Sequence, residues 1–190
     1  MLKIAFHQNY IHPLDTNHRF PMIKYELIPE QLLRENTCSP NNFFEPGIIS
    51  DEIVLKTHEQ EYFERFKNLK LSKKEVREIG FPLSKELVTR EMTIAQGTID
   101  CVNYSLKNGI SMNIAGGTHH AFYDRGEAFC MLNDQAIAAK YLINKKLAKK
   151  IMIIDLDVHQ GNGTASIFNT NEEVFTISFH GKKNYPFRKE

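Results

Sequence analysis

A run of four apolar residues at positions 151–154 constrains the fold of this chain more than any other feature. A short, continuous apolar run is typical of a strand in a parallel sheet whose two faces are both covered. A helical pattern precedes it at residues 133–146, and a second strand pattern follows it at residues 174–179. This alternation predicts an α/β fold on a parallel sheet with right-handed crossovers. Ligands of such sheets bind beyond the carboxyl ends of the strands.

The longest helical pattern covers residues 83–107, where apolar side chains recur every three or four positions along one face. Asn108 and Gly109 follow it and predict a left-handed end to the helix. The other expected elements are a strand at residues 2–6, a helix at 20–35 with a break at Pro29, a loop at 38–46, a helix at 58–69, a buried strand at 110–115 and a short helix at 162–169.

Composition excludes several classes of protein. With 42% hydrophobic and 25% charged residues, the chain is an ordinary globular one and is neither disordered nor fibrous. Its 24 basic and 23 acidic residues give no electrostatic case for nucleic acid or an anionic membrane as partner. No apolar run is long enough for a spanning helix, and the first residues do not resemble a secretory signal. Because three scattered cysteines cannot form a disulfide framework, we expect a cytoplasmic location.

The first chemical motif is Gly-Gly-Thr-His-His at residues 116–120, directly after the strand predicted at 110–115. Paired glycines let the backbone approach a ligand closely. Two adjacent imidazoles, His119 and His120, can divide the work of a proton relay. The alternative is that both are ordinary polar residues of a surface loop.

The second motif places Asp155, Asp157 and His159 at alternate positions after the apolar run. Strand side chains alternate in direction, so these three are expected to share one face. Two carboxylates on one face repel each other unless a cation lies between them. Aspartate with histidine favours zinc over calcium or magnesium. The alternative, an aspartate that caps the next helix, accounts for only one of the three.

The third motif, Glu-Ala-Phe-Cys-Met-Leu-Asn-Asp, covers residues 127–134. Phe129 lies in a predicted loop, and taken alone such a phenylalanine is most often part of the core. Asn133 and Asp134 are expected to cap the helix that follows.

In this order and spacing, the three motifs resemble the histone deacetylase superfamily, and Gln-Gly-Asn at residues 160–162 is most similar to the class IV branch and its bacterial relatives. The resemblance implies a three-layer arginase/deacetylase-like fold with a parallel sheet. It also implies a zinc-dependent hydrolase of C–N amide bonds, a deacetylase that acts on acyl-lysine or a related acylated amine through a metal-activated water.

The resemblance also implies roles for single residues. Asp157 and His159 match two zinc ligands, and His120 matches the general base. His119 matches its partner in a His-His relay, held by a carboxylate that corresponds to Asp155. The substrate-binding positions match Gly117, Phe129 and Tyr185, and a structural site for a monovalent cation such as potassium matches Asp155, Asp157, His159 and Ser178.

Two departures from the family pattern matter. Asn162 stands where many relatives have a carboxylate, so His120 is expected to be less basic than in those relatives. No aspartate follows Asp157, although the third zinc ligand and a catalytic tyrosine lie further downstream in the family. We therefore expect residues 1–190 to be the N-terminal part of a single catalytic domain, incomplete at the C-terminus. Such a fragment should bind zinc weakly, turn over little substrate and self-associate through exposed apolar surface.

Two other functions share parts of this pattern. A binuclear manganese ureohydrolase shares the fold but needs further carboxylates, and Gly161 and Asn162 stand near the aspartate–histidine pair instead. An inactive or non-catalytic interaction module of the same fold would not need the retained histidines. The exact substrate stays open, because acetylated protein lysine, acetylated polyamines and longer acyl chains would all use these residues.

Overall fold

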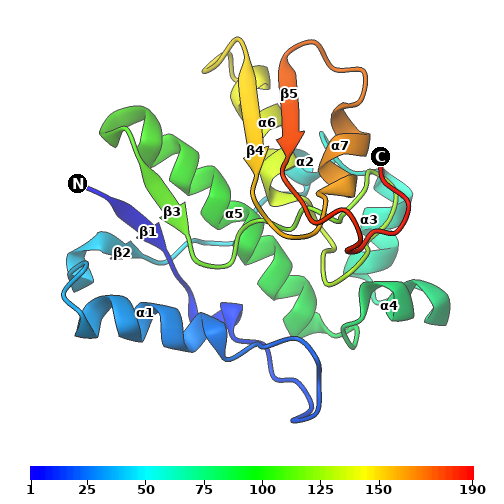
Figure 1. Cartoon of the computed structure of the whole chain (residues 1–190), viewed down its shortest axis with the longest axis horizontal. Coiled ribbons are helices and arrows are strands. Elements are labelled where there is room, and N and C mark those ends of the chain that lie inside the picture. The colour runs from blue at the N-terminus through cyan, green and yellow to red at the C-terminus, as the bar shows by residue number, and fades with distance from the viewer. The chain divides into compact units, whose positions relative to one another are not determined.

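The computed structural model describes the whole chain, Met1–Glu190, which divides into two compact units. The first unit combines Met1–Ile49 with Ser84–Gly116, and the second combines Ser50–Leu83 with Gly117–Glu190. Each unit has its own parallel sheet, with helices beside the strands (Figure 1).

The sheet of the first unit has the order β2-β1-β3 and is entirely parallel. Its central strand β1 (Lys3–Ala5) pairs with β2 (Phe43–Phe44) on one side and β3 (Ser111–Asn113) on the other. In this register Ile4 lies opposite both Phe43 and Met112. The unit also contains helix α1 (Lys24–Arg34), the long helix α5 (Lys85–Asn108) and short 3₁₀ turns at Gln8–Tyr10 and Pro40–Asn42.

Helix α5 begins and ends where its sequence provides caps. The hydroxyl of Ser84 accepts a hydrogen bond from the amide of Leu87, and Gly109 ends the helix at φ 84°. Gly97 lets the helix approach the sheet closely, because a Cβ there would lie 2.4 Å from the hydroxyl of Tyr10 and 2.9 Å from Nδ2 of Asn113. The long periodic pattern therefore predicted this helix to within two residues at each end.

The second unit is built on the parallel pair β4 (Ile151–Asp155) and β5 (Val174–Ser178). Helices α6 (Asp134–Asn144) and α7 (Asn162–Phe168) share its hydrophobic core. The core cluster consists of Ala136, Ala139, Ile153, Phe168 and Val174. Three short helices complete the unit, α2 (Asp51–Val54), α3 (Gln60–Lys67) and α4 (Lys73–Ile79).

Four local expectations were wrong. Strand β3 is shorter than the buried strand expected at residues 110–115, and Met112 at its centre is 50% exposed. The segment predicted as a loop contains β2, because Phe43 and Phe44 offer their backbone to β1. Helix α1 runs through Pro29 without a break. Strand β4 is not covered on both faces, since Met152 is 62% exposed while the neighbouring Ile153 is buried.

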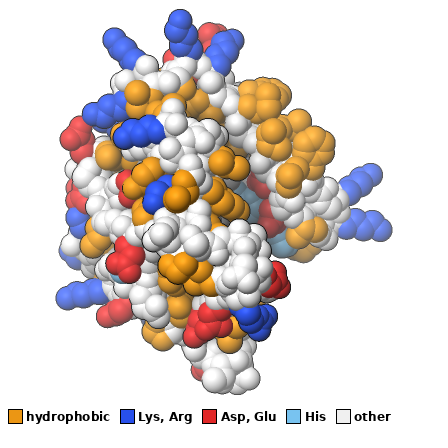
Figure 2. Space-filling model, turned by 90° about the vertical axis from the view of Figure 1, so that its left-hand side faces the viewer, with side chains coloured by type: hydrophobic (Ala, Val, Ile, Leu, Met, Phe, Trp, Pro, Cys, Tyr) orange, Lys and Arg blue, Asp and Glu red, His pale blue; other side chains and the backbone are white.

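The surface carries apolar as well as charged side chains. On the face shown in Figure 2, hydrophobic side chains lie in groups between acidic and basic ones. Strongly exposed apolar residues of the second unit include Leu156, Phe175, Phe179 and Phe187. None of the helices combines the length and the apolar character that a membrane crossing requires.

Candidate active site

The loop that carries the two adjacent histidines is fastened to the N-terminus of α6. The amides of Gly117 and Thr118 donate to the carboxylate of Asp134, at 3.0 Å and 2.8 Å. Gly117 has φ 90°, a left-handed conformation that favours glycine. Asn133 caps α6 by accepting from the amide of Ala136, as its position predicted. These bonds hold the start of the His119–His120 segment in one conformation.

His119 is paired with the carboxylate at the end of β4. Its Nδ1 lies 2.6 Å from Oδ2 of Asp155. Burial alone would raise the pKa of Asp155, but the hydrogen bonds from His119 and from the amide of Asp157 outweigh it, so the pKa is lowered. Gly161 permits this approach, because a Cβ there would lie 2.2 Å from Oδ2 of Asp155. Asp155 is therefore an ionised partner that orients the imidazole of His119.

His120 lies deeper than a surface base would, at 4% exposure. Its Nδ1 is 2.6 Å from Oδ1 of Asn162, the first residue of α7. Burial and then the neighbouring His119 lower the pKa of His120 to about 4, whereas the hydrogen bond with Asn162 raises it. The low basicity expected from the neutral Asn162 thus has burial as its main cause. At neutral pH His120 is an uncharged imidazole with one free lone pair.

Asp157 and His159 do not share a strand face, because β4 ends at Asp155 and both residues lie in the loop that follows. They nevertheless converge. Oδ1 of Asp157 accepts from the amide of His159 at 2.7 Å and lies 3.0 Å from Nδ1 of its ring. The ring centroids of His120 and His159 are 6.0 Å apart. The site therefore brings one carboxylate and one imidazole to the edge of the His119–His120 pair.

This donor pair fits zinc in kind, because carboxylate oxygen and imidazole nitrogen are both common zinc ligands. Three protein ligands are the usual minimum for a zinc site. No group of three or more His, Cys, Asp or Glu side chains that could hold a metal occurs in residues 1–190. The chain thus brings together one carboxylate and one imidazole, which are side chains of the kinds that bind zinc.

Phe129 lies in a tight turn whose two central residues are both left-handed. Ala128 has φ 44° and Phe129 has φ 68°, and Glu127 and Cys130 form a bridge on either side of them. Left-handed conformations are unfavourable for residues other than glycine and cluster at functional sites. The ring of Phe129 packs against that of Phe81, with 5.0 Å between the ring centroids. The aromatic ring is therefore held in place by a strained and well-bonded turn.

The ring of Tyr185 lies beside the rings of His120 and His159. Its ring centroid is 5.1 Å from that of His120 and 6.4 Å from that of His159. Its hydroxyl donates to Oε2 of Glu127 at 2.6 Å. Burial and the adjacent Glu127 raise the pKa of Tyr185, so the hydroxyl stays protonated. Tyr185 thus presents its ring, and not a charge, to the site.

Ser178, named as a ligand of a monovalent cation, ends β5 directly opposite Asp155. Its hydroxyl is 2.9 Å from Nδ1 of His180. Asp155, Ser178 and His180 all line one cavity of about 220 Å³. The strand ends therefore place the side-chain oxygens of Asp155 and Ser178 beside the same space.

Two functional candidates were missed in the sequence. Glu127 accepts hydrogen bonds from the hydroxyl of Tyr185 and, at 3.4 Å, from Nδ2 of Asn162. No spacing of residues in the sequence predicts either contact. His58 is 1% exposed, and its Nε2 accepts from the amide of Asn133 at 2.9 Å. Burial lowers the pKa of His58 to about 4. The only sequence signal for Glu127 was its place in the third motif. For His58 it was that its partner, Asn133, lies in the same motif.

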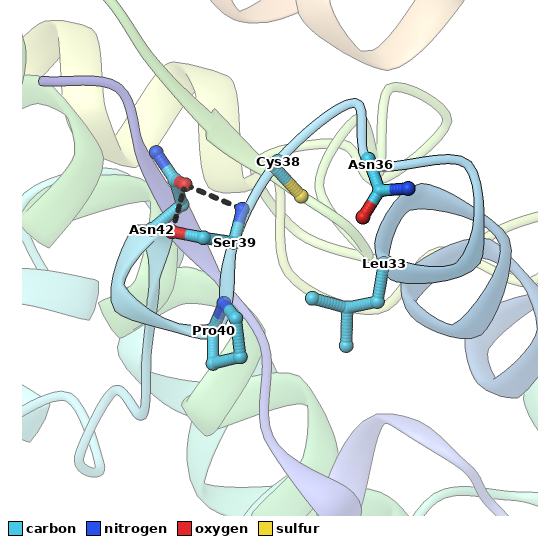
Figure 3. A pocket seen from close by; sticks show the side chains of 6 residues that line it. All are labelled: Leu33, Asn36, Cys38, Ser39, Pro40 and Asn42. Atoms are coloured by element: carbon cyan, nitrogen blue, oxygen red, sulfur yellow. Dashed lines mark hydrogen bonds between the residues drawn. The ribbon is translucent and has the colours of Figure 1, made fainter.

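A hollow of about 590 Å³ in the first unit carries none of this chemistry. Figure 3 shows that Asn42 turns its side-chain oxygen toward Ser39 and accepts from both its amide and its hydroxyl, at 2.8 Å and 3.0 Å. The lining consists of Leu33, Asn36, Cys38, Ser39, Pro40 and Asn42. No imidazole or carboxylate is among these residues, so the second unit holds the candidate site.

Comparisons with known proteins identify relatives of the chain. The family model described as "Histone deacetylase domain" matches residues 15–190. An uncharacterized protein of Picosynechococcus sp. is 40% identical over 187 residues, which cover 98% of this chain and 62% of that protein. The acetoin utilization protein AcuC of Staphylococcus aureus is 30% identical over 181 residues, which cover 89% of this chain and 46% of that protein.

Solved structures show the same fold. The HDAC homolog from Aquifex aeolicus has a TM-score of 0.83 at 24% identity and is matched over 99% of this chain and 54% of its own. An HDAC homolog complexed with SAHA has a TM-score of 0.85 at 25% identity, with the same coverage. These likenesses confirm the arginase/deacetylase fold with its parallel strands. The chain spans about half the length of these solved structures, and it belongs to the histone deacetylase family.

Proposed function

We propose that this chain carries part of the active centre of a zinc-dependent deacetylase, which hydrolyses the amide bond of acyl-lysine or a related acylated amine. One observation carries the proposal. His119 and His120 are each anchored through Nδ1 at 2.6 Å, one by Asp155 and the other by Asn162. Such anchoring fixes both rings, as a relay of protons requires.

Asp157 and His159 would hold the zinc ion, since their donor atoms converge within 3.0 Å of each other. When bound, zinc supplies Lewis-acid polarisation of the substrate carbonyl and a more acidic water. In the proposed potassium site, the main-chain carbonyls of these two residues would join the side chains of Asp155 and Ser178, which lie opposite each other at the strand ends.

His120 acts as the general base in this proposal. Because it is neutral at physiological pH, it accepts a proton from the attacking water at Nε2 and later returns one to the leaving amine. His119 stays oriented by the ionised Asp155 and supports the charge that develops on its neighbour. Their ring centroids are 4.1 Å apart, which is close enough for this support.

Aromatic rings suit a substrate with an apolar stem. The ring of Tyr185 beside His120 and the ring of Phe129, held in its strained turn, offer flat apolar surfaces to a lysine side chain. The family match and the SAHA complex of a structural neighbour support a substrate of this kind.

The test is hydrolysis of an acetyl-lysine peptide by the protein expressed from its complete reading frame. We expect turnover that a zinc chelator abolishes, and loss of turnover in Asp157→Ala and His159→Ala. Glu172→Ala, which removes an exposed carboxylate at the far end of β5, is the matched control and should behave as wild type. Turnover that resists the chelator, or a zinc-loaded protein that cleaves no acyl-lysine, would contradict the proposal, and the latter would favour a non-catalytic module.

A further inference from the structure

The side chains of His120, Asn162 and Glu127 are linked in a row by hydrogen bonds. Nδ1 of His120 is 2.6 Å from Oδ1 of Asn162, and Nδ2 of the same amide is 3.4 Å from Oε2 of Glu127. All three residues belong to the second unit, and His120 and Asn162 are each only 4% exposed. Water therefore has little access to the amide of Asn162, so neighbouring side chains determine the orientation of that amide.

An asparagine amide is ambiguous in a way that a carboxylate is not. Its oxygen only accepts hydrogen bonds and its nitrogen only donates them, so the amide can present either group to His120. If the oxygen faces the ring, Nδ1 must carry the proton and Nε2 keeps its lone pair. If the amide turns over, Nδ1 becomes the acceptor and Nε2 carries the proton. The orientation of Asn162 therefore determines which nitrogen of His120 can act as a base.

Glu127 resolves this ambiguity because a carboxylate can only accept. Its Oε2 requires the NH₂ group of Asn162 on its side, and this leaves the amide oxygen for His120. Glu127 itself is held by two further donors, the hydroxyl of Tyr185 at 2.6 Å and Nε of Arg125 at 3.2 Å. Its backbone is fixed by reciprocal hydrogen bonds with Cys130, at 3.0 Å and 2.8 Å.

We propose that Glu127 is a positioning residue that orients the amide of Asn162 and so keeps the proton of His120 on Nδ1. Asn162 and Glu127 together do what a single carboxylate beside the histidine would do. Glu127 touches no reacting atom, and its effect on catalysis rests on the proposed function of His120 as the base. Its effect on the tautomer does not depend on that function.

The experiment is nitrogen-15 NMR of the histidine rings at fixed neutral pH, with the His120 signals assigned from His120→Gln. In the wild-type chain we expect a protonated Nδ1 and an unprotonated Nε2. Glu127→Leu, which is similar in size and cannot accept, should give a mixture of both tautomers. Glu127→Ala is the second variant should leucine unfold the chain.

Two further variants separate Glu127 from its neighbours. Tyr185→Phe removes the other hydrogen bond to Oε2 and should leave the tautomer of His120 unchanged, because Asn162 keeps its partner. In the double variant Glu127→Leu/Asn162→Asp, a carboxylate faces His120 directly and the Nδ1-protonated form should return. In the complete protein, kcat should fall in Glu127→Leu with KM little changed, and the double variant should regain part of it.

Three results would overturn the proposal: a wild-type His120 with its proton on Nε2, a leucine or alanine variant that keeps the wild-type tautomer, or a double variant that does not restore it. Because the NMR measurement needs neither zinc nor substrate, these outcomes are independent of turnover. A correct tautomer pattern in a protein that cleaves no acyl-lysine would refute the proposed function and leave the role of Glu127 intact.

Discussion

The buried His58 should make the protein lose stability in mild acid. Its Nε2 accepts a hydrogen bond from the amide of Asn133, the residue that caps α6. A second proton on the ring would remove that acceptor and place a charge at a site that is 1% exposed. The pKa of His58 is accordingly lowered from 6.5 to about 4, mainly by burial.

The sign and size of the effect follow from this pKa. Above pH 6.5 the ring is neutral in both the folded and the unfolded chain, so His58 gives no pH dependence there. Below pH 6.5 the unfolded chain binds the proton while the folded chain does not, so the free energy of unfolding decreases as the pH falls. The decrease ends once the pH has fallen through the folded pKa of about 4. Each pKa unit is worth about 1.4 kcal/mol, so the full loss is about 3 kcal/mol. At about pH 5 some 2 kcal/mol of it is already lost.

Urea unfolding at about pH 8 and about pH 5 measures this effect. Because the chain has no tryptophan, far-ultraviolet circular dichroism is the suitable probe. His58→Gln can still accept from Asn133 but does not titrate, so its stability should differ between the two pH values by about 2 kcal/mol less than that of wild type. Thr57→Val, a change at the adjacent buried position, should keep the wild-type difference. If His58→Gln loses as much stability in acid as wild type, then protonation of His58 is not the cause of the loss.

Further predictions concern the bonds around the site. Asn133→Ala removes the cap of α6 and two side-chain donor bonds, to the carbonyl of Ala121 and to Thr164, so its free energy of unfolding should fall by about 3 kcal/mol in urea titrations. Gly163→Ala would place a Cβ 2.3 Å from the same carbonyl of Ala121 and should cost about 1–3 kcal/mol in the same assay, whereas Gly47→Ala meets nothing within 4 Å and should stay within about 1 kcal/mol of wild type. Residues 1–190 hold no group of three or more His, Cys, Asp or Glu side chains for a metal, so isothermal titration of this chain should find weak zinc binding, and tight stoichiometric zinc would contradict this.

The fold was predictable wherever a pattern repeats along one element. Helix α5 was located closely because its apolar face recurs along the helix and Gly109 predicts its end. Strand β2 has only two residues, Phe43 and Phe44, and two residues show no alternation. Pro29 predicted a break that tertiary packing overrode, since it is buried within an unbroken helix. Local propensity therefore failed where contacts from elsewhere decided the conformation.

The site was predictable in its members more than in its geometry. The pairs His119–Asp155 and His120–Asn162 were expected from the resemblance to the family, and each pair lies at 2.6 Å. The alternation rule failed at Asp157, because the strand ends before it. Glu127 was out of reach, since its contact with Asn162 joins residues 35 positions apart and its contact with Tyr185 joins residues 58 apart. Only a folded backbone reveals such partners.

The proposed function depends on His120, anchored through Nδ1, acting as the base of an amide hydrolase. The most direct measurement compares kcat for an acetyl-lysine peptide in the complete, zinc-loaded protein and in its His120→Gln variant. In the variant we expect kcat to fall by about 10²–10⁴-fold, while zinc content and KM change little. A variant that keeps wild-type kcat with full zinc content would show that His120 is not the base.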